Sequence, residues 1–143
     1  MSTARSPYFA PGMPLPAVTE DTRPFWEGCR HRELRIQRCT GCETLRHPPA
    51  PVCWRCRSFA HEWVAVSGRG TIFTHALVHR AFLPELTASV PYNVVVVALD
   101  DAPGVRLVSN LIDGEPVIGL PVEVAFEDVS PELAVPRFRV RRA

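Results

Sequence analysis

Lysine is absent from this chain of 143 residues, and all sixteen of its basic residues are arginine. The formal net charge is only +1, so the chain as a whole lacks the excess of positive charge that dedicated polyanion-binding domains carry. The arginines are nevertheless unevenly placed, because eight of them fall between Arg23 and Arg57, against three glutamates. A GC-rich genome would explain the missing lysine, and guanidinium groups also suit phosphate and carboxylate ligands. The sequence leaves both explanations open.

Long apolar runs are also missing. The longest one, Val94–Leu99, is far too short to cross a bilayer, and no apolar segment follows Met1–Arg5 as it would in a secretory signal. We therefore expect a cytoplasmic protein without membrane contact. With 46% hydrophobic and 22% charged residues, the chain has the composition of a folded globular protein. Its length suits a small metal-bound module beside a compact core.

Cysteine is scarce, but four of the five cysteines form two Cys-x-x-Cys pairs, Cys39 with Cys42 and Cys53 with Cys56, ten residues apart. Four soft thiolates at this spacing can surround one zinc ion tetrahedrally. We expect Gly41 to permit the tight turn of the first pair through a positive φ. The sequence therefore predicts a structural Zn²⁺ site.

Three other uses of the cysteines compete with this prediction. One Cys-x-x-Cys can be a redox dithiol, but two pairs at this spacing favour metal. Disulfides are less expected, because the four cysteines are clustered and Cys29 is left over. A catalytic zinc would need an open position for water, and four thiolates leave none.

The segment before the cysteines divides into an arm and a helix. Residues 1–18 are rich in proline and lack apolar periodicity, so we expect an extended arm. The alternative is that its apolar residues dock on the body or on a partner; these are Tyr8, Phe9, Met13 and Leu15. A short helix from about Arg23 to about Arg32 would place Phe25, Trp26 and Cys29 on one side. Cys29 is expected to be a buried thiol.

From the cysteines onward the patterns are those of strands. Leu34–Arg38 alternates apolar and polar residues, which suits a strand entering the first cysteine pair, and residues 19–60 would form the helix and zinc ribbon. Residues 61–143 would form a small barrel in which the Gly68 to Gly70 region bends the chain. Its expected strands are 62–67, 71–79, 93–99, 105–111, 122–127 and 138–140, with 93–99 buried on both faces. The predicted class is mainly β, closed as a small antiparallel Greek-key barrel of the OB type because closure removes exposed edges.

Five separated motifs now stand in a recognisable order. They are Phe25-Trp26, the two Cys-x-x-Cys pairs with Pro48-Pro49 between them, Gly68-Arg69-Gly70-Thr71, Pro91-Tyr92 and Ile118-Gly119-Leu120-Pro121-Val122. Together, from about Leu15 to about Arg139, they resemble the DUF35 family of acyl-CoA-associated OB-fold proteins with an N-terminal rubredoxin-like zinc ribbon. The resemblance implies that the four cysteines of the two pairs bind the metal, and it carries over no catalytic residue.

The same resemblance implies a non-catalytic accessory subunit in a hetero-oligomer. Its partner would be a thiolase-fold acyl-CoA enzyme, such as an acetyltransferase, an acyltransferase or a sterol side-chain aldolase, in lipid or steroid metabolism. The alternative partner is a hot-dog-fold enoyl-CoA hydratase. The subunit would assist acyl-CoA binding or stabilise the complex. Residues of suitable type for contact with the ligand or partner are Trp26, Arg46, Arg55, Arg57 and Arg80.

The residues also suggest two further functions. Zinc ribbons and OB barrels both occur in proteins that bind single-stranded nucleic acid, but the near-neutral charge and the acidic barrel argue against that function. His75 and His79 would share a strand face, where they could act as acid and base. No nucleophile motif accompanies them, so an enzyme acting alone is the least favoured interpretation.

Overall fold

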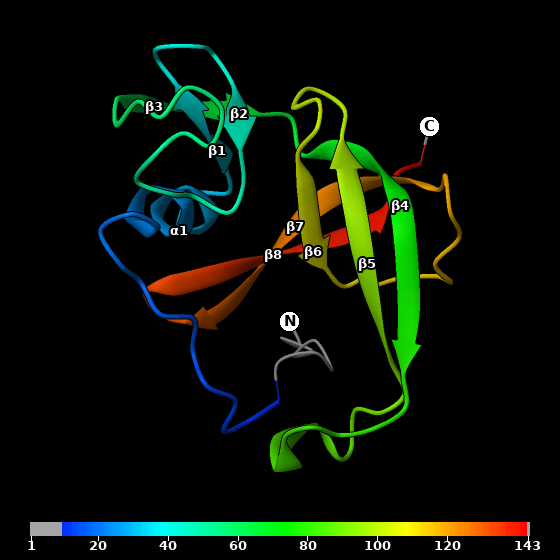
Figure 1. The fold of residues 1–143 in the computed structure, drawn as a ribbon. Coiled ribbons are helices and arrows are strands. Elements are labelled where there is room, and N and C mark those ends of the chain that lie inside the picture. The colour runs from blue at the N-terminus through cyan, green and yellow to red at the C-terminus, as the bar shows by residue number, and fades with distance from the viewer. Residues whose placement is uncertain (1–9, 143) are drawn as a thin grey trace.

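The computed structural model describes residues 10–142 and shows a mainly β protein with one short α-helix (Figure 1). Its elements, in chain order, are α1 (Arg23–Arg30), β1 (Leu34–Cys39), β2 (Leu45–Arg46), β3 (His61–Val66), β4 (Arg69–Val78), the 3₁₀ turn η1 (Pro84–Leu86), β5 (Tyr92–Leu99), β6 (Arg106–Ser109), β7 (Pro121–Ser130) and β8 (Leu133–Val140). The predicted class, a helix and zinc ribbon followed by an antiparallel OB-type barrel, is confirmed.

Helix α1 ends two residues earlier than its sequence pattern indicates. Arg32 adopts a left-handed φ of 61°, which no helix can continue. The N–H of Glu33 donates to the carbonyl of Gly28 at 2.8 Å, and the N–H of Arg32 donates to the carbonyl of Cys29 at 3.1 Å. This pair of bonds is a Schellman termination, which satisfies the last carbonyl groups of a helix. The expected helix up to Arg32 was therefore too long.

The ribbon is a three-stranded antiparallel sheet in the order β2-β1-β3. We expected the strand that begins at His61 to pair within the barrel, but its hydrogen-bonded neighbour is β1 of the ribbon. β3 pairs with β1 along six residues, from Leu34 opposite Val66 to Cys39 opposite His61. A strand whose polar and apolar residues alternate can pair with the edge of either sheet, and this strand pairs with the free edge of β1. The sheet of the ribbon therefore continues to Val66.

The barrel is a five-stranded antiparallel sheet in the order β6-β5-β4-β7-β8. Its two outer strands meet near Leu111 and Phe138, which form a parallel bridge. There the N–H of Ile112 donates to the carbonyl of Phe138 at 2.8 Å, and the N–H of Phe138 donates to the carbonyl of Asn110 at 3.0 Å. These bonds nearly close the sheet on itself. In Figure 1 the long β7–β8 hairpin runs from the barrel to the underside of α1.

Several strand boundaries differ from the expected ones. β7 and β8 are each longer than their alternating patterns indicate, because they form one hairpin that pairs from Val122 with Val140 to Ser130 with Leu133. β5 is not buried on both faces: alternate residues are buried and the others are half-buried, so one side of its valine run is only partly covered. β4 has a register shift between Ile72 and Thr74, beyond the Gly68 to Gly70 region where we expected the chain to bend.

The ribbon and the barrel share one hydrophobic core. Phe25 of α1 and Ile36 of β1 belong to the same buried cluster as Val95, Val122 and Phe138 of the barrel. On the surface, Arg32 and Asp128 add an ion pair of 2.6 Å between the two parts. The helix therefore packs against the barrel as well as against the ribbon, and the two units hold a fixed geometry.

The described part of the arm, residues 10–18, contains neither helix nor strand. Met13 is half-buried and, with Leu86 and Tyr92, lines a shallow hollow on the barrel. Tyr8 and Phe9, which could also dock, lie outside the described residues. Within residues 10–142, no helix has the length and apolar character that a bilayer crossing requires.

Candidate metal centre and adjacent pocket

The four cysteine sulfurs of the two pairs converge at one end of the ribbon. Their Sγ atoms all lie within 4.8 Å of one another. Sγ of Cys39 is 3.5 Å from that of Cys56, and Sγ of Cys42 is 3.6 Å from that of Cys53. Zinc–sulfur bonds of about 2.3 Å in a tetrahedron require sulfur–sulfur edges of about 3.8 Å. The predicted cluster is therefore formed, and its size fits one zinc ion.

Two turns of the same design present these sulfurs. After the first pair, the N–H of Glu43 donates to the carbonyl of Cys39, and after the second, the N–H of Arg57 donates to the carbonyl of Cys53, both at 2.9 Å. Glu43 and Arg57 both have φ of 64°. Gly41, which we expected at positive φ, does not adopt it. The left-handed residue is instead the one that follows the second cysteine of each pair.

The electrostatics of the cluster also call for a cation. A hydrogen bond with the Thr44 side chain, 3.1 Å away, is the main cause that lowers the pKa of Cys42 to about 6. The backbone N–H of Ser58 lowers the pKa of Cys56, but the neighbouring thiols of Cys39, Cys42 and Cys53 raise it to about 11. Four adjacent thiolates repel one another, and a divalent cation removes that repulsion. The residues therefore fit a structural zinc ion, which all four sulfurs would hold.

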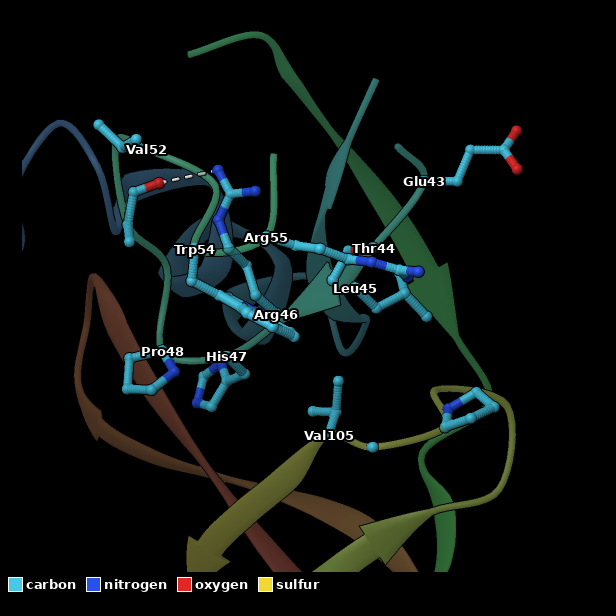
Figure 2. A pocket seen from close by; sticks show the side chains of 13 residues that line it. Glu43, Thr44, Leu45, Arg46, His47, Pro48, Val52, Trp54, Arg55 and Val105 are labelled. Carbon is cyan, nitrogen blue, oxygen red and sulfur yellow. Dashed lines mark hydrogen bonds between the residues drawn. The ribbon is translucent and has the colours of Figure 1, made fainter. Parts of the chain in front are cut away.

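A pocket of about 650 Å³ lies beside the metal centre, between the ribbon and the barrel. Figure 2 shows the two walls of this pocket. The ribbon wall runs from β2 through the following loop to the second cysteine pair, and the barrel wall includes Val105 of the β5–β6 turn. The residues that line it are Glu43, Thr44, Leu45, Arg46, His47, Pro48, Ala50, Val52, Trp54, Arg55, Pro103, Gly104 and Val105. The pocket thus joins the two parts of the fold.

The structure brings together only some of the predicted contact residues. Arg46, buried on β2, and Arg55, exposed between the cysteines of the second pair, both line the pocket. Trp26 lines a second hollow of about 320 Å³. Arg57 lies on the second cysteine turn but does not line either space. Arg80 is distant from both, on the loop after β4, with its guanidinium 5.5 Å from the ring of Phe82.

Sequence reasoning missed two residues of this region. Trp54 stands between the cysteines of the second pair with 73% of its surface exposed, although an aromatic residue beside a metal turn is a readable signal of a contact surface. His47 is half-buried, with its ring centroid 5.0 Å from that of Phe25. Burial lowers the pKa of His47 to about 4, so its imidazole is neutral at physiological pH. No pattern in the sequence marks that burial.

The histidines considered for catalysis lie elsewhere. His75 is on β4, opposite Val95 of β5, and His79 follows the end of that strand. Both side chains are exposed, and neither lines the pocket beside the metal centre. These histidines therefore belong neither to the four-cysteine cluster nor to the lining of the pocket.

Two family models match successive parts of the chain. Residues 26–62 match the rubredoxin-like zinc ribbon domain of ChsH2, and residues 63–127 match its C-terminal OB-fold domain. The first match contains all four clustered cysteines, so the metal centre is the one that this ribbon model describes.

Two of the curated relatives are considerably longer than this chain. A probable enoyl-CoA hydratase alpha subunit of Thermomonospora curvata is 39% identical over 88% of this chain, which is 39% of that protein. The 3-oxo-4,17-pregnadiene-20-carboxyl-CoA hydratase alpha subunit of Mycobacterium tuberculosis is 38% identical over 81% of this chain and 37% of that protein. The chain thus spans less than two-fifths of each of these relatives.

One solved structure matches over almost its whole length. It is described as an Ltp2-ChsH2(DUF35) aldolase, and the matched chain is 37% identical, with a TM-score of 0.76. The match covers 88% of this chain and 98% of that chain. Sequence and fold therefore agree along both the ribbon and the barrel.

Proposed function

The chain belongs to the DUF35 family, and from this membership we propose that it is a non-catalytic subunit that docks on an acyl-CoA enzyme in the cytoplasm. The observation that carries the proposal is its 37% identity across 98% of a chain from an aldolase complex. The partner would perform the reaction, and this subunit would stabilise the partner and help to hold the acyl-CoA. In this proposal the active species is the complex of the enzyme with this subunit.

The metal centre supports an architectural role. Four sulfurs complete the coordination of zinc, so the ion offers no position for water or substrate. Its contribution is to fix the two cysteine turns and, through them, the ribbon wall of the pocket. A rigid ribbon that shares its core with the barrel presents one continuous surface to a partner.

The barrel surface supports docking. Six large apolar side chains on the barrel and its loops are more than half exposed: Phe73, Leu77, Phe82, Val108, Val117 and Ile118. Where exposed apolar side chains lie together in one patch, they are typical of interaction surfaces. We propose that burial of some of these side chains accompanies assembly with the enzyme.

Two classes of partner follow from the relatives. The aldolase complex favours a thiolase-fold enzyme, while the two curated hydratase alpha subunits favour a hot-dog-fold hydratase. We propose the thiolase-fold partner first, because the matched chain of the aldolase agrees with this chain in both sequence and fold, at 37% identity and a TM-score of 0.76.

Co-expression tests the proposal and separates the two partners. The tagged chain is expressed with a thiolase-fold aldolase from the same genome, and separately with a hot-dog-fold hydratase, and each co-purified complex is sized. We expect the aldolase to co-purify stoichiometrically and to lose solubility and activity when expressed without this chain. If the aldolase is soluble and fully active by itself, the accessory role is contradicted. If only the hydratase co-purifies with the chain, the partner is a hot-dog-fold hydratase and not a thiolase-fold enzyme.

A further inference from the structure

The side of β5 that faces away from the barrel core is as apolar as its buried side. β5 carries four consecutive valines, of which Val95 and Val97 are fully buried while Val94 and Val96 are half-buried. An antiparallel sheet with one face in water normally places polar residues on that face. The sequence predicts burial of both sides of this strand, and the fold of the chain by itself buries only one. The outer side of β5 therefore has the composition of a covered surface.

The neighbouring strands extend this side of β5. Directly opposite residues of an antiparallel pair place their side chains on the same face. Val96 lies opposite Thr74 of β4 and Val108 of β6, and Val94 lies opposite Ala76 of β4. β4, β5 and β6 stand side by side in Figure 1, so these residues form one continuous surface. We call it the outer face, and its main members are Phe73 and Ala76 of β4, Val94 and Val96 of β5, and Arg106 and Val108 of β6.

Phe73 and Arg106 contribute the largest side chains of the outer face. Phe73 is the extra residue at the register shift of β4, and such bulges redirect a side chain. Arg106 and Val108 are two residues apart on β6 and so share a face. Cζ of Arg106 lies 4.5 Å from the centroid of the Phe73 ring, which places Phe73 on that face too. With Phe73 54% and Val108 66% exposed, the outer face is an apolar patch of the kind found at interaction surfaces.

The outer face carries positive charge and no negative charge. The three strands that form it contain no acidic residue. Within residues 10–142 Arg106 forms no ion pair, and the hydrogen bond from its Nη1 to the carbonyl of Val105 is long, at 3.5 Å. A guanidinium over an aromatic ring keeps N–H groups available for a carboxylate. The outer face therefore fits a surface that is apolar and bears a carboxylate.

Neither a second copy of this chain nor its own arm offers such a surface. Two outer faces packed against each other would bring together two copies of Arg106 and supply no acid. Residues 1–18 contain Arg5 and no acidic residue. Met13 lines a hollow that Val94 also borders, but the lining of that hollow does not include Arg106. The charge of the outer face thus favours a different protein as its occupant.

We infer that the outer face is the surface that this subunit buries against its acyl-CoA enzyme, and that the enzyme meets it with an apolar patch and a carboxylate for Arg106. This inference rests on the proposed function, because the chemistry of the face describes the partner's surface and does not identify the enzyme. Assembly buries the outer side of β5, as its valine run predicts. Phe73 and Arg106 are the main contacts, since aromatic and arginine side chains are enriched among the residues that dominate binding energy.

Photo-cross-linking identifies what covers the outer face. The cross-linking residue p-benzoylphenylalanine is placed at Val108 of the full zinc-loaded chain, which is co-expressed with the thiolase-fold aldolase, or with the hydratase if only that enzyme co-purifies. Leu77 is the control position, because it is 55% exposed but lies opposite Asn93, which is on the buried side of β5. We expect cross-links to the enzyme from position 108 and few from position 77. Cross-links from position 108 to a second copy or to residues 1–18, or equal yields from the two positions, overturn the inference.

Substitutions test the two main contacts. Each variant is co-expressed with the enzyme, and dissociation of the co-purified complex on dilution gives its Kd. Phe73→Ala and Arg106→Gln should each raise the Kd about tenfold, and Arg106→Glu about a hundredfold. Leu77→Ala, which truncates an equally exposed side chain, and Arg57→Gln, which removes an exposed charge from the ribbon, should each change the Kd less than about twofold. Added salt should weaken the wild-type complex more than the Arg106→Gln complex, because salt screens the charge contact.

Circular dichroism and zinc content show that each free variant is folded. If Phe73→Ala and Arg106→Gln leave the Kd at the wild-type value, this inference fails and the proposed function stands, since the wild-type complex still forms. If the wild-type chain captures neither enzyme, the proposed function fails and this inference fails with it. The two failures are therefore distinguished by whether the wild-type complex exists.

Discussion

Ser67 and Asp101 are joined by two hydrogen bonds across the junction of the ribbon and the barrel. The backbone N–H of Ser67 donates to Oδ2 of Asp101 at 2.8 Å, and the Ser67 hydroxyl donates to Oδ1 at 3.1 Å. Ser67 directly follows β3, and Asp101 begins the turn that carries Pro103 to Val105, the barrel wall of the pocket. One carboxylate therefore sets the position of one pocket wall relative to the other.

Loss of this link should loosen the pocket without removing any group that lines it. For Asp101→Ala we expect a decrease of about 1 kcal/mol in the free energy of unfolding, because the two bonds are charge-assisted but exposed. Urea unfolding measures this loss. Asp100→Ala is the matched control, since that carboxylate pairs with Arg141 at 3.5 Å instead. Equal losses of stability for the two variants would contradict the positioning role.

Zinc removal should act first on the cysteine turns and not on the whole chain. The apparent free energy of structural zinc binding, about 10–16 kcal/mol, is comparable to the entire stability of a small domain. A strong chelator should therefore release one zinc per chain and abolish amide protection between residues 39 and 58. Protection in α1 and the barrel should persist longer, because Phe25 shares its core with Phe138. Hydrogen exchange followed by mass spectrometry resolves the two regions.

The five cysteines supply the control for that experiment. Cys53→Ser should bind zinc far more weakly, whereas Cys29→Ala should keep one zinc per chain, because Cys29 lies in the core and outside the cluster. Burial raises the pKa of Cys29 to about 12, so its thiol stays protonated and does not compete for metal. A zinc content that Cys29→Ala lowers as strongly as Cys53→Ser would contradict the assigned ligand set.

Gly68 is required for both conformation and space at the start of the barrel. Its φ is +79°, and an added Cβ would lie 2.2 Å from Cγ1 of Val124, across the β4–β7 contact. Gly68→Ala should therefore lower stability by about 2–4 kcal/mol, the range for combined backbone strain and overpacking. Gly119→Ala is the control, since Gly119 has φ of +88° but no atom within 4 Å of an added Cβ. Gly119→Ala should cost only about 1 kcal/mol in thermal or urea unfolding. If both variants lose a similar amount of stability, the loss at Gly68 comes from its positive φ and not from contact with Val124.

The sequence predicted those features that depend on residues close together in the chain. The four metal ligands were readable because Cys39 and Cys42 act through a turn of fixed length, as do Cys53 and Cys56. The barrel was readable because its strands alternate and its turns carry glycine and proline.

Features that depend on distant residues were not readable. The pattern of β3 suits either sheet, and only the free edge of β1 decides between them. The burial of Arg46 and the pocket near Trp54 arise where the ribbon loop meets the β5–β6 turn, more than forty residues later in the chain. Arg57 and Arg80 have the same side chain as Arg46, so composition could not separate them from the residues that line the pocket.

His47 should make stability depend on pH below neutrality. Burial lowers its folded-state pKa to about 4, while an unfolded histidine titrates near 6.5. Between these values the unfolded chain binds the proton and the folded chain does not, so stability falls as the pH decreases from about 6.5 to about 4. The shift corresponds to at most about 3 kcal/mol, and solvent contact at this half-buried ring reduces the expected loss to about 1–2 kcal/mol.

His47→Phe should remove this dependence, because an aromatic ring can keep the contact with Phe25 without titrating. Acid also protonates the cysteine thiolates and weakens zinc binding in both proteins, so the informative quantity is the difference between them at each pH. Urea unfolding of both zinc-loaded proteins should show that the stability of His47→Phe relative to wild type increases from about pH 7 to about pH 5. If the two curves stay parallel, His47 does not experience the burial that its position between α1 and the pocket implies.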